Sequence, residues 1–241
     1  MKDVLDVHTH TVSSGHAYNT IWEMAKGAAD KGLELLGITD HAPKMPGSCH
    51  EFHFLNLKVV PREINGIAVM LGAELNILDY DGNVDLPESY LKQMDLTIAS
   101  LHQPCISPGT AGQNTQAYIK AMENPYINII GHPDDGRYEI YYEDLVRAAK
   151  EHGVLLEINN NSLNPRGFRK NAVENDREIL KLCKKYEVPV IMGSDAHVVT
   201  DIGRHERVEA LLLETEFPEE LVVNRSTEEL MKYINYGRRK L

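Results

Sequence analysis

Seven short apolar runs, rich in Val, Ile and Leu, divide this chain of 241 residues. They occupy residues 4–7, 35–38, 68–71, 96–99, 127–130, 154–158 and 188–192. Apolar residues recur at helical spacing between several of these runs, within 21–29, 145–149 and 179–183. Strands that alternate with helices are typical of a parallel sheet covered by helices. Because no linker or repeat interrupts the pattern, we predict an α/β fold in a single domain over residues 1–241.

The charge and the cysteines narrow the classes of partner and site. The chain has 25 Lys and Arg against 36 Asp and Glu, and this net charge of −11 repels phosphate backbones and anionic lipid. We therefore expect no stable nucleic-acid partner. No apolar stretch suits a signal peptide or a membrane span, so we expect a cytoplasmic protein without membrane association. Cys49, Cys105 and Cys183 are widely spaced, which indicates reduced thiols rather than a disulfide framework or a thiolate zinc site.

Polar side chains follow the apolar runs at the point where each run ends. In chain order they are His8 and His10, Asp40 and His41, Glu74, His102, His132, Asn159 to Asn161, and Asp195 and His197. In a parallel barrel the carboxyl ends of the strands converge on one face, where barrel enzymes place their chemistry. We expect these segments to deliver imidazoles, carboxylates and amides to one concave surface.

The spacing of these residues favours a metal site. His8 and His10 are two residues apart on extended chain, so both imidazoles point to the same side, and Asp195 and His197 repeat that spacing. Glu74 has two carboxylate oxygens with which to bridge two ions. Histidine and carboxylate ligands without cysteine suit zinc, manganese or iron rather than calcium, which prefers oxygen ligands only.

An ordered series of short motifs carries a family resemblance. The segments are His8 to Thr11, Ile38 to His41, Gly72 to Glu74, Ser100 to His102, Gly131 to Pro133 and Gly193 to His197. This series resembles the motifs of the PHP-domain (polymerase and histidinol phosphatase) metallohydrolases over essentially the whole chain. Within that family, residues 157–162, 193–197 and 217–219 most resemble the YcdX-type probable phosphatases. The specificity lies in the order of the series, since each tripeptide alone is common.

The resemblance implies a distorted seven-stranded (β/α)7 TIM-like barrel that holds three divalent transition-metal ions, with zinc preferred and manganese or iron as alternatives. The implied ligands are His8, His10, Glu74 and Asp195 for the first ion, Glu74 with His102 and His132 for the second, and His16, His41 and His197 for the third. His16 lies in a polar loop and is assigned by the resemblance. A homo-oligomer, as a trimer, is also consistent with the resemblance.

The implied chemistry is hydrolysis of a small phosphomonoester. Adjacent cations orient a dianionic phosphoryl group and lower the pKa of a bridging water towards about 7. We expect the nucleophile to be a metal-bridging hydroxide held by Glu74 and Asp195, with the third ion polarising a phosphate oxygen. Ser100, Cys105 and Ser194 lie close to the expected ligands in sequence but have no visible partner base. A covalent nucleophile is therefore not expected.

Several residues near these motifs have two interpretations. Asn160 either binds substrate oxygens or belongs to a polar turn. Arg166 and Arg169 either donate paired hydrogen bonds to two oxygens of a phosphate or are solvated. Asp6 and Asp40 either orient ligand imidazoles or have structural roles.

The remaining histidines fall outside the motif series. Residues 43–61 show little periodicity and are predicted as a functional or capping loop that carries His50 and His53. We predict His152 and His205 to be helix-surface residues.

Other functions stay open. Within the family, a histidinol-phosphate phosphatase and a 3′-to-5′ exonuclease are alternatives, although an aromatic content of 7% and the absence of a basic domain disfavour the nuclease. Amidohydrolase barrels also begin with a His-x-His strand, but they usually hold one or two ions, so counting bound metals separates the two classes. A non-catalytic metal-binding protein is the last alternative, and a full ligand set disfavours it.

Overall fold

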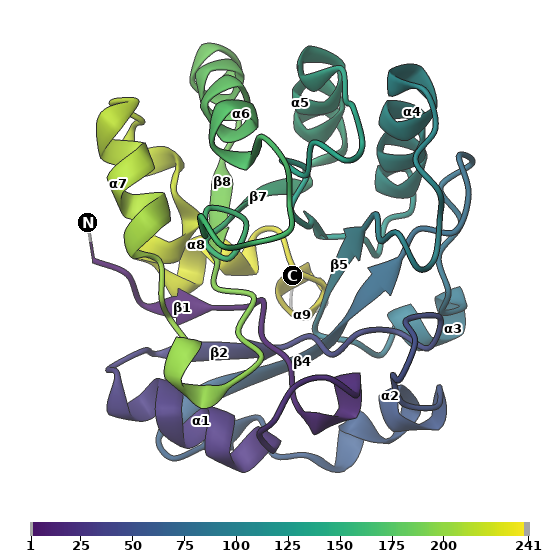
Figure 1. The fold of residues 1–241 in the computed structure, drawn as a ribbon. Helices are drawn as coiled ribbons and strands as arrows, with labels where there is room; N and C mark the ends of the chain where they lie inside the picture. The colour runs from purple at the N-terminus through teal and green to yellow at the C-terminus, as the bar shows by residue number, and fades with distance from the viewer. Residues whose placement is uncertain (1, 239–241) are drawn as a thin grey trace.

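A computed structural model describes residues 2–238 and contains one sheet of eight strands. Seven of them run parallel in the order β1-β2-β4-β5-β6-β7-β8 (Figure 1). Their bounds are β1 Leu5–Asp6, β2 Leu35–Ile38, β4 Ile67–Asn76, β5 Leu96–Ser100, β6 Ile129–Ile130, β7 Leu155–Asn159 and β8 Val190–Gly193. Each apolar run predicted as a strand overlaps one of them. The sequence does not predict β3 (Glu63–Ile64), which pairs antiparallel with β4.

The sheet closes where the chain continues beyond β1 and β8. Thr9 and Ala196 form a parallel bridge, and the His10 N–H donates to the Ala196 carbonyl over 2.9 Å. The first and last strands of the order therefore meet, and the predicted seven-stranded β/α barrel is confirmed.

Helices cover the outside of this barrel (Figure 1). The longer ones are α1 Ile21–Asp30, α4 Ala111–Met122, α5 Tyr142–His152, α6 Ala172–Tyr186 and α7 Glu206–Glu214, and the shorter ones are α2 Phe52–Asn56, α3 Glu88–Leu91, α8 Thr227–Met231 and α9 Asn235–Arg238. Apolar spacing predicted α1, α5 and α6, whereas residues 43–61, predicted as a loop, include α2. In α1 a capping box between Thr20 and Glu23 fixes the first turn. Among residues 2–238, no helix is both long and apolar enough to span a membrane.

The two ends of the barrel interior differ in chemistry. Apolar side chains fill the end where the strands begin, and α8 and α9 lie across it. We call this the lower end of the barrel, and the opposite end the upper end. The apolar cluster at the lower end includes Leu5, Leu35, Leu96, Ile129, Leu155, Leu230 and Ile234. The end where the strands finish is lined by buried polar side chains instead. The packing of the lower end thus leaves the upper end free to hold a site.

Strand β4 is longer than its apolar run and carries Glu74 within it. Its first half pairs with β2 as far as Leu71, and its second half pairs with β5 from Gly72 onwards. A Cβ atom on Gly72 would lie 2.0 Å from the Leu96 carbonyl oxygen, so glycine permits the close approach of β5. The expectation that the strand ends before Glu74 is wrong, because Gly72 continues the strand.

His205 is buried, so its prediction as a helix-surface residue is wrong. It stands just before α7, and 1% of it is exposed. Its Nδ1 atom lies 2.6 Å from the Asp3 carboxylate and its Nε2 atom 3.7 Å from that of Asp6. Burial by itself would lower the His205 pKa, but these two carboxylates raise it from 6.5 to about 10. The contacts fix the start of the chain to α7. The other predicted surface histidine, His152, is half-buried as the last residue of α5.

The raised pKa of His205 predicts how stability depends on pH. Its contribution is complete below the unfolded pKa of 6.5 and is lost as pH rises through about 10. The variant His205→Gln should lower the free energy of unfolding by on the order of 3 kcal/mol at pH 6, and by progressively less towards pH 10. Urea unfolding at several pH values measures this difference, with His152→Gln as the control. A difference that is the same at every pH would contradict the ion pair.

Candidate metal centre

Nine residues predicted as ligands lie together at the carboxyl ends of the strands. They are His8, His10, His16, His41, Glu74, His102, His132, Asp195 and His197. Their backbone positions lie in or directly after β1, β2, β4, β5, β6 and β8, except that His16 lies in the loop after the short turn Val12–Ser14. Of the nine, only His16 is exposed. Residues from six strands of the barrel thus meet in one mostly buried cluster.

Glu74 lies at the middle of this cluster, with an oxygen towards each of two groups of imidazoles. The Oε1 atom is 2.9 Å from His132 Nε2, 3.1 Å from His102 Nε2 and 3.5 Å from His8 Nε2. The Oε2 atom is 2.7 Å from His41 Nδ1 and 3.7 Å from His10 Nε2. A carboxylate placed in this way can contact two cations at once.

Asp195 divides its two oxygens between the cluster and an arginine. The Oδ1 atom lies 3.3 Å from His10 Nε2 and 3.5 Å from His197 Nδ1. The Oδ2 atom accepts a hydrogen bond from Arg169 over 3.0 Å. Asp195 has a φ of 55° and His132 a φ of 31°, a region that non-glycine residues seldom adopt. Backbone strain is thus concentrated at two candidate ligands.

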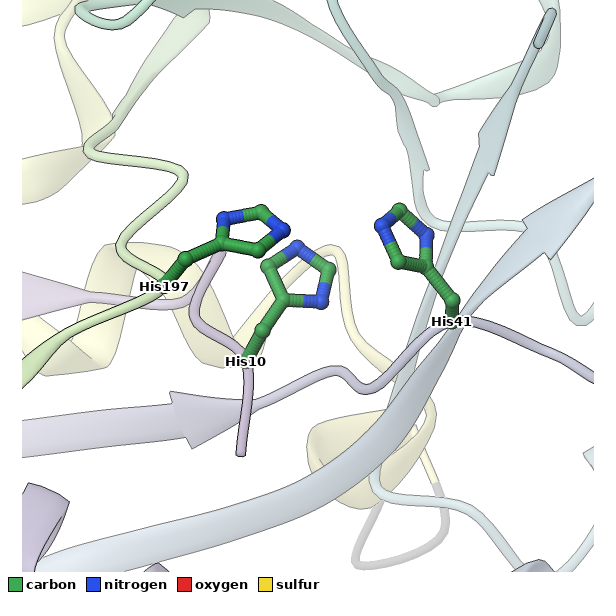
Figure 2. A group of neighbouring side chains, drawn as sticks. All are labelled: His10, His41 and His197. Carbon is green, nitrogen blue, oxygen red and sulfur yellow. The ribbon is translucent and has the colours of Figure 1, made fainter. Parts of the chain in front are cut away.

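The histidines of the third implied site lie side by side. The ring centroid of His16 is 4.9 Å from that of His41 and 4.8 Å from that of His197. His10 also contacts this group, with its centroid 4.3 Å from those of both His41 and His197. Figure 2 shows the imidazoles of His10, His41 and His197 approaching one another from three separate segments.

Within residues 2–238, three overlapping groups of side chains each have their ligand atoms within 4.8 Å of one another. They are His8, His10 and Glu74; His41, Glu74 and His102; and His10, His41 and His197. His10, His41 and Glu74 each belong to two groups. The geometry therefore gathers the ligands without dividing them into three sets, and the division implied by the resemblance stays a prediction.

Glu157 fixes the orientation of His8, a role that the sequence analysis did not assign to it. Its Oε1 atom lies 2.6 Å from His8 Nδ1, which leaves His8 Nε2 facing the cluster. Its Oε2 atom accepts the N–H of His132 over 2.8 Å. A Cβ atom on Gly193 would lie 1.9 Å from Glu157 Oε1, so only glycine leaves room for this carboxylate. The signal in the sequence was a charged residue inside the apolar run 154–158.

Two further side chains orient imidazoles in the same way. Asn76 Oδ1 lies 2.7 Å from His102 Nδ1, and Ser14 Oγ lies 3.1 Å from His10 Nδ1. Ser14 in turn donates to Asp40 over 2.7 Å. Asp40 thus acts on His10 through a hydroxyl, which refines the expectation that it orients an imidazole.

Asp6 organises backbone rather than an imidazole of the cluster. Its carboxylate accepts the N–H groups of Ser194 over 3.3 Å and Gly203 over 2.8 Å, and it also bonds the Ser194 hydroxyl. The His8 N–H donates to it over 3.4 Å. Of the two alternatives for Asp6, the structure supports the structural role.

The charges in the cluster suit cation binding. Burial alone would raise the pKa of Glu74, but the imidazoles of His102, His41 and His8 hold it well below its ordinary value. Burial lowers the pKa of His10 well below its ordinary value, and the neighbouring His197 and His41 lower it further. An ionised Glu74 and a neutral His10 are the protonation states in which these side chains bind metals. His8 differs: burial alone would lower its pKa, but the carboxylates of Glu157, Glu74 and Asp195 raise it well above the ordinary value.

Several buried polar atoms that face the cluster have no hydrogen-bond partner. They include Nε2 of His8, Nε2 of His10 and Oε2 of Glu74. Each buried polar atom without a partner costs about 1–3 kcal/mol. Cations of the transition series would satisfy these nitrogen and oxygen donors, so the side chains present fit a metal centre.

A cavity of about 680 Å³ opens beside the cluster. Its lining consists of His16, His41, Met45, His102, Gln103, Pro104, Arg137, Asn161, Phe168, Arg169, Asp195 and His197. Cys105 lies nearby, but burial raises the pKa of its thiol to about 11, so the thiolate is scarce at neutral pH. The expectation that no cysteine nucleophile operates is consistent with this value.

The residues predicted to bind substrate lie in different places. Arg169 lines the cavity and donates to Asp195, Asn159 and Ser162. Asn160 lines a smaller neighbouring cavity of about 160 Å³, and its side-chain oxygen accepts the N–H of Arg207. Arg166 is exposed and lines neither of these two cavities. Of the three, Arg169 alone donates a hydrogen bond to a candidate metal ligand, Asp195.

A β/α barrel that gathers histidines and carboxylates at the carboxyl ends of its strands resembles the class of metal-binding barrel enzymes in its fold and in the side chains it offers to a metal. Comparison with protein families identifies the family to which the chain belongs. The PHP domain profile matches residues 6–161, and the PHP-associated profile matches residues 174–210. The chain therefore belongs to the PHP domain family.

Several curated relatives are similar over nearly their whole length. Proteins named "probable phosphatase" are 49% identical in Clostridium novyi, over 97% of this chain and 95% of the relative, and 53% identical in Caldicellulosiruptor saccharolyticus, over 95% of both chains. Among solved structures, histidinol phosphate phosphatase from Lactococcus lactis, complexed with zinc, L-histidinol and phosphate, superposes with a TM-score of 0.60. It is 17% identical, over 90% of this chain and 95% of that one. The likeness confirms the fold.

The space that Gly193 leaves for Glu157 predicts a selective loss of metal. In Gly193→Ala the new Cβ atom collides with Glu157, so Glu157 can no longer hold His8. Metal affinity should fall by about 10- to 100-fold. Competition with a chelator measures this affinity, and thermal unfolding checks that the fold is kept. In the control Gly112→Ala, on α4, the nearest atom is 3.8 Å away, so affinity should not change. Wild-type affinity in Gly193→Ala would refute the role of Glu157.

Proposed function

We propose that this protein is a metal-dependent phosphatase that hydrolyses small phosphomonoesters at a centre of three divalent transition-metal ions, with zinc preferred. The observation that carries the proposal is Glu74, a buried carboxylate with both oxygens among imidazoles from several strands. The names of relatives at 44–53% identity support a phosphatase. Zinc in the histidinol phosphate phosphatase structure supports the choice of metal.

The proposed ligands follow the division implied by the family resemblance. The first ion takes His8, His10, Glu74 and Asp195, the second takes Glu74, His102 and His132, and the third takes His16, His41 and His197. The contacts of Glu74 Oε1 with His8, His102 and His132 support its place between the first two ions. The ring contacts of His16 with His41 and His197 support the third site, and its exposure leaves that site open to the cavity.

When bound, such ions neutralise a phosphoryl dianion and lower the pKa of coordinated water. The chain's own residues position them and the substrate. Arg169 fixes Asp195 from outside the cluster while presenting its guanidinium to the cavity. Only Glu74 and Asp195 among the proposed ligands are anionic, so three divalent ions leave the centre with a net charge of about +4. This local charge attracts a phosphate although the whole chain carries −11.

The cavity favours a small substrate over a polymer. Its volume of about 680 Å³ lies in the range of sites that enclose small molecules, about 300–1,000 Å³. We propose that Arg169 is the arginine nearest the substrate phosphate. Asn160 and Arg166 are proposed to contact the substrate farther from the metal centre. A single functional domain over residues 1–241, a trimeric assembly and a cytoplasmic location stay predictions from the sequence.

A substrate screen on purified protein tests this function. The screen should include small phosphomonoesters, histidinol phosphate among them, with a phosphodiester and a cyclic amide to represent the nuclease and amidohydrolase alternatives. We expect phosphomonoester hydrolysis that prolonged chelation abolishes and that zinc or manganese restores, whereas magnesium alone does not.

Two outcomes would contradict the proposal. Full phosphatase activity in protein shown by elemental analysis to lack transition metal would refute the metal dependence. Hydrolysis of the amide or the diester without hydrolysis of any monoester would assign the site to another activity.

A further inference from the structure

Phe168 is a large apolar side chain that stands exposed in the wall of the cavity. Its exposed fraction is 65%. Other exposed aromatic residues, such as Trp22 on α1 and Tyr141 before α5, do not line this cavity. An exposed ring beside a polar cluster is costly to hydrate and is a common contact surface for ligands.

Two arginines hold the Phe168 ring in place. The guanidinium carbon of Arg137 lies 4.7 Å from the ring centroid, and that of Arg169 lies 5.5 Å from it. Arg137 already donates to the carboxylate of Asp135 over 2.9 Å and to Gln103 over 2.9 Å. The protein therefore holds the Arg137 guanidinium in place, and its flat face supports the ring.

These contacts connect the ring to the candidate metal cluster through both arginines. Gln103, which Arg137 contacts, directly follows His102. Arg169, which directly follows Phe168, donates to Asp195. The ring thus has a fixed place beside the cluster, where the alcohol part of a phosphomonoester would lie.

We propose that Phe168 is the stacking surface for a flat, unsaturated ring in the alcohol part of the substrate. The proposal rests on the phosphatase function and names its substrate class. A phosphoryl group fills only a small part of a cavity of about 680 Å³, so space remains for a ring. Met45 and Pro104 add apolar surface to the same cavity. Stacked aromatic pairs prefer centroids about 4.5–7 Å apart, which a ring lying on Phe168 satisfies.

A matched pair of substrates tests this inference. Benzyl phosphate and cyclohexylmethyl phosphate have similar size and similar leaving alcohols, but only the first has a flat ring. For the metal-loaded wild type we expect kcat/KM to be about 2- to 10-fold higher for benzyl phosphate, the range that aromatic stacking provides. In Phe168→Leu the ratio should fall to about one, and in Phe168→Tyr it should persist. Trp22→Leu, which removes an exposed aromatic residue of α1 outside the cavity, should keep the wild-type ratio.

The outcomes separate this inference from the function on which it rests. Equal kcat/KM for the two esters in the wild type, or a preference that survives in Phe168→Leu, would overturn the stacking role and leave the phosphatase intact. Activity on other monoesters but on neither of these two would do the same. Hydrolysis of no monoester at all would overturn both.

Discussion

The site depends on one buried carboxylate, that of Glu74. An ionised carboxylate with no solvent access is very costly unless opposite charges or strong donors surround it. Here imidazoles from several strands supply that surrounding, and strand β4 reaches the middle of the barrel because Gly72 lets it run on beside β5. Three of the nitrogens that face Glu74, those of His8, His10 and His41, themselves lack hydrogen-bond partners. Cations between the carboxylate and the imidazoles would offset the negative charge of Glu74 and would also give these nitrogens a partner.

The barrel tolerates so polar a centre because one of its ends stabilises the fold and the other holds the polar cluster. The lower end is packed with leucine and isoleucine and is covered by α8 and α9, and a second apolar layer lies between the strands and the outer helices. These layers stabilise the fold without the cluster. The upper end can then contain strained backbone, as the left-handed conformations of His132 and Asp195 show. The same packing fixes Glu157, which enters from β7 and holds His8 through the space at Gly193.

Much of this architecture is predictable from the sequence, because apolar periodicity and strand-end residues are local signals. The seven parallel strands, helix α1 and the meeting of His8 with Glu74 and Asp195 all follow from them. Contacts between distant segments are not local. Glu157, Asn76 and the burial of His205 by Asp3 depend on which strands become neighbours, so spacing along the chain could not reveal them. Phe168 was missed for the same reason, since its place beside Arg137 arises only in the folded cavity.

The metal content of purified protein tests the central claim most directly. Elemental analysis should find about three transition-metal ions per chain in the wild type and in His152→Ala, a control histidine at the end of α5. It should find about two in His16→Ala, which disturbs only the third ion, and about one in Glu74→Gln, which disturbs the two ions that share this carboxylate. Two or fewer ions in the wild type, or undiminished metal content in Glu74→Gln, would contradict a three-ion centre built around Glu74.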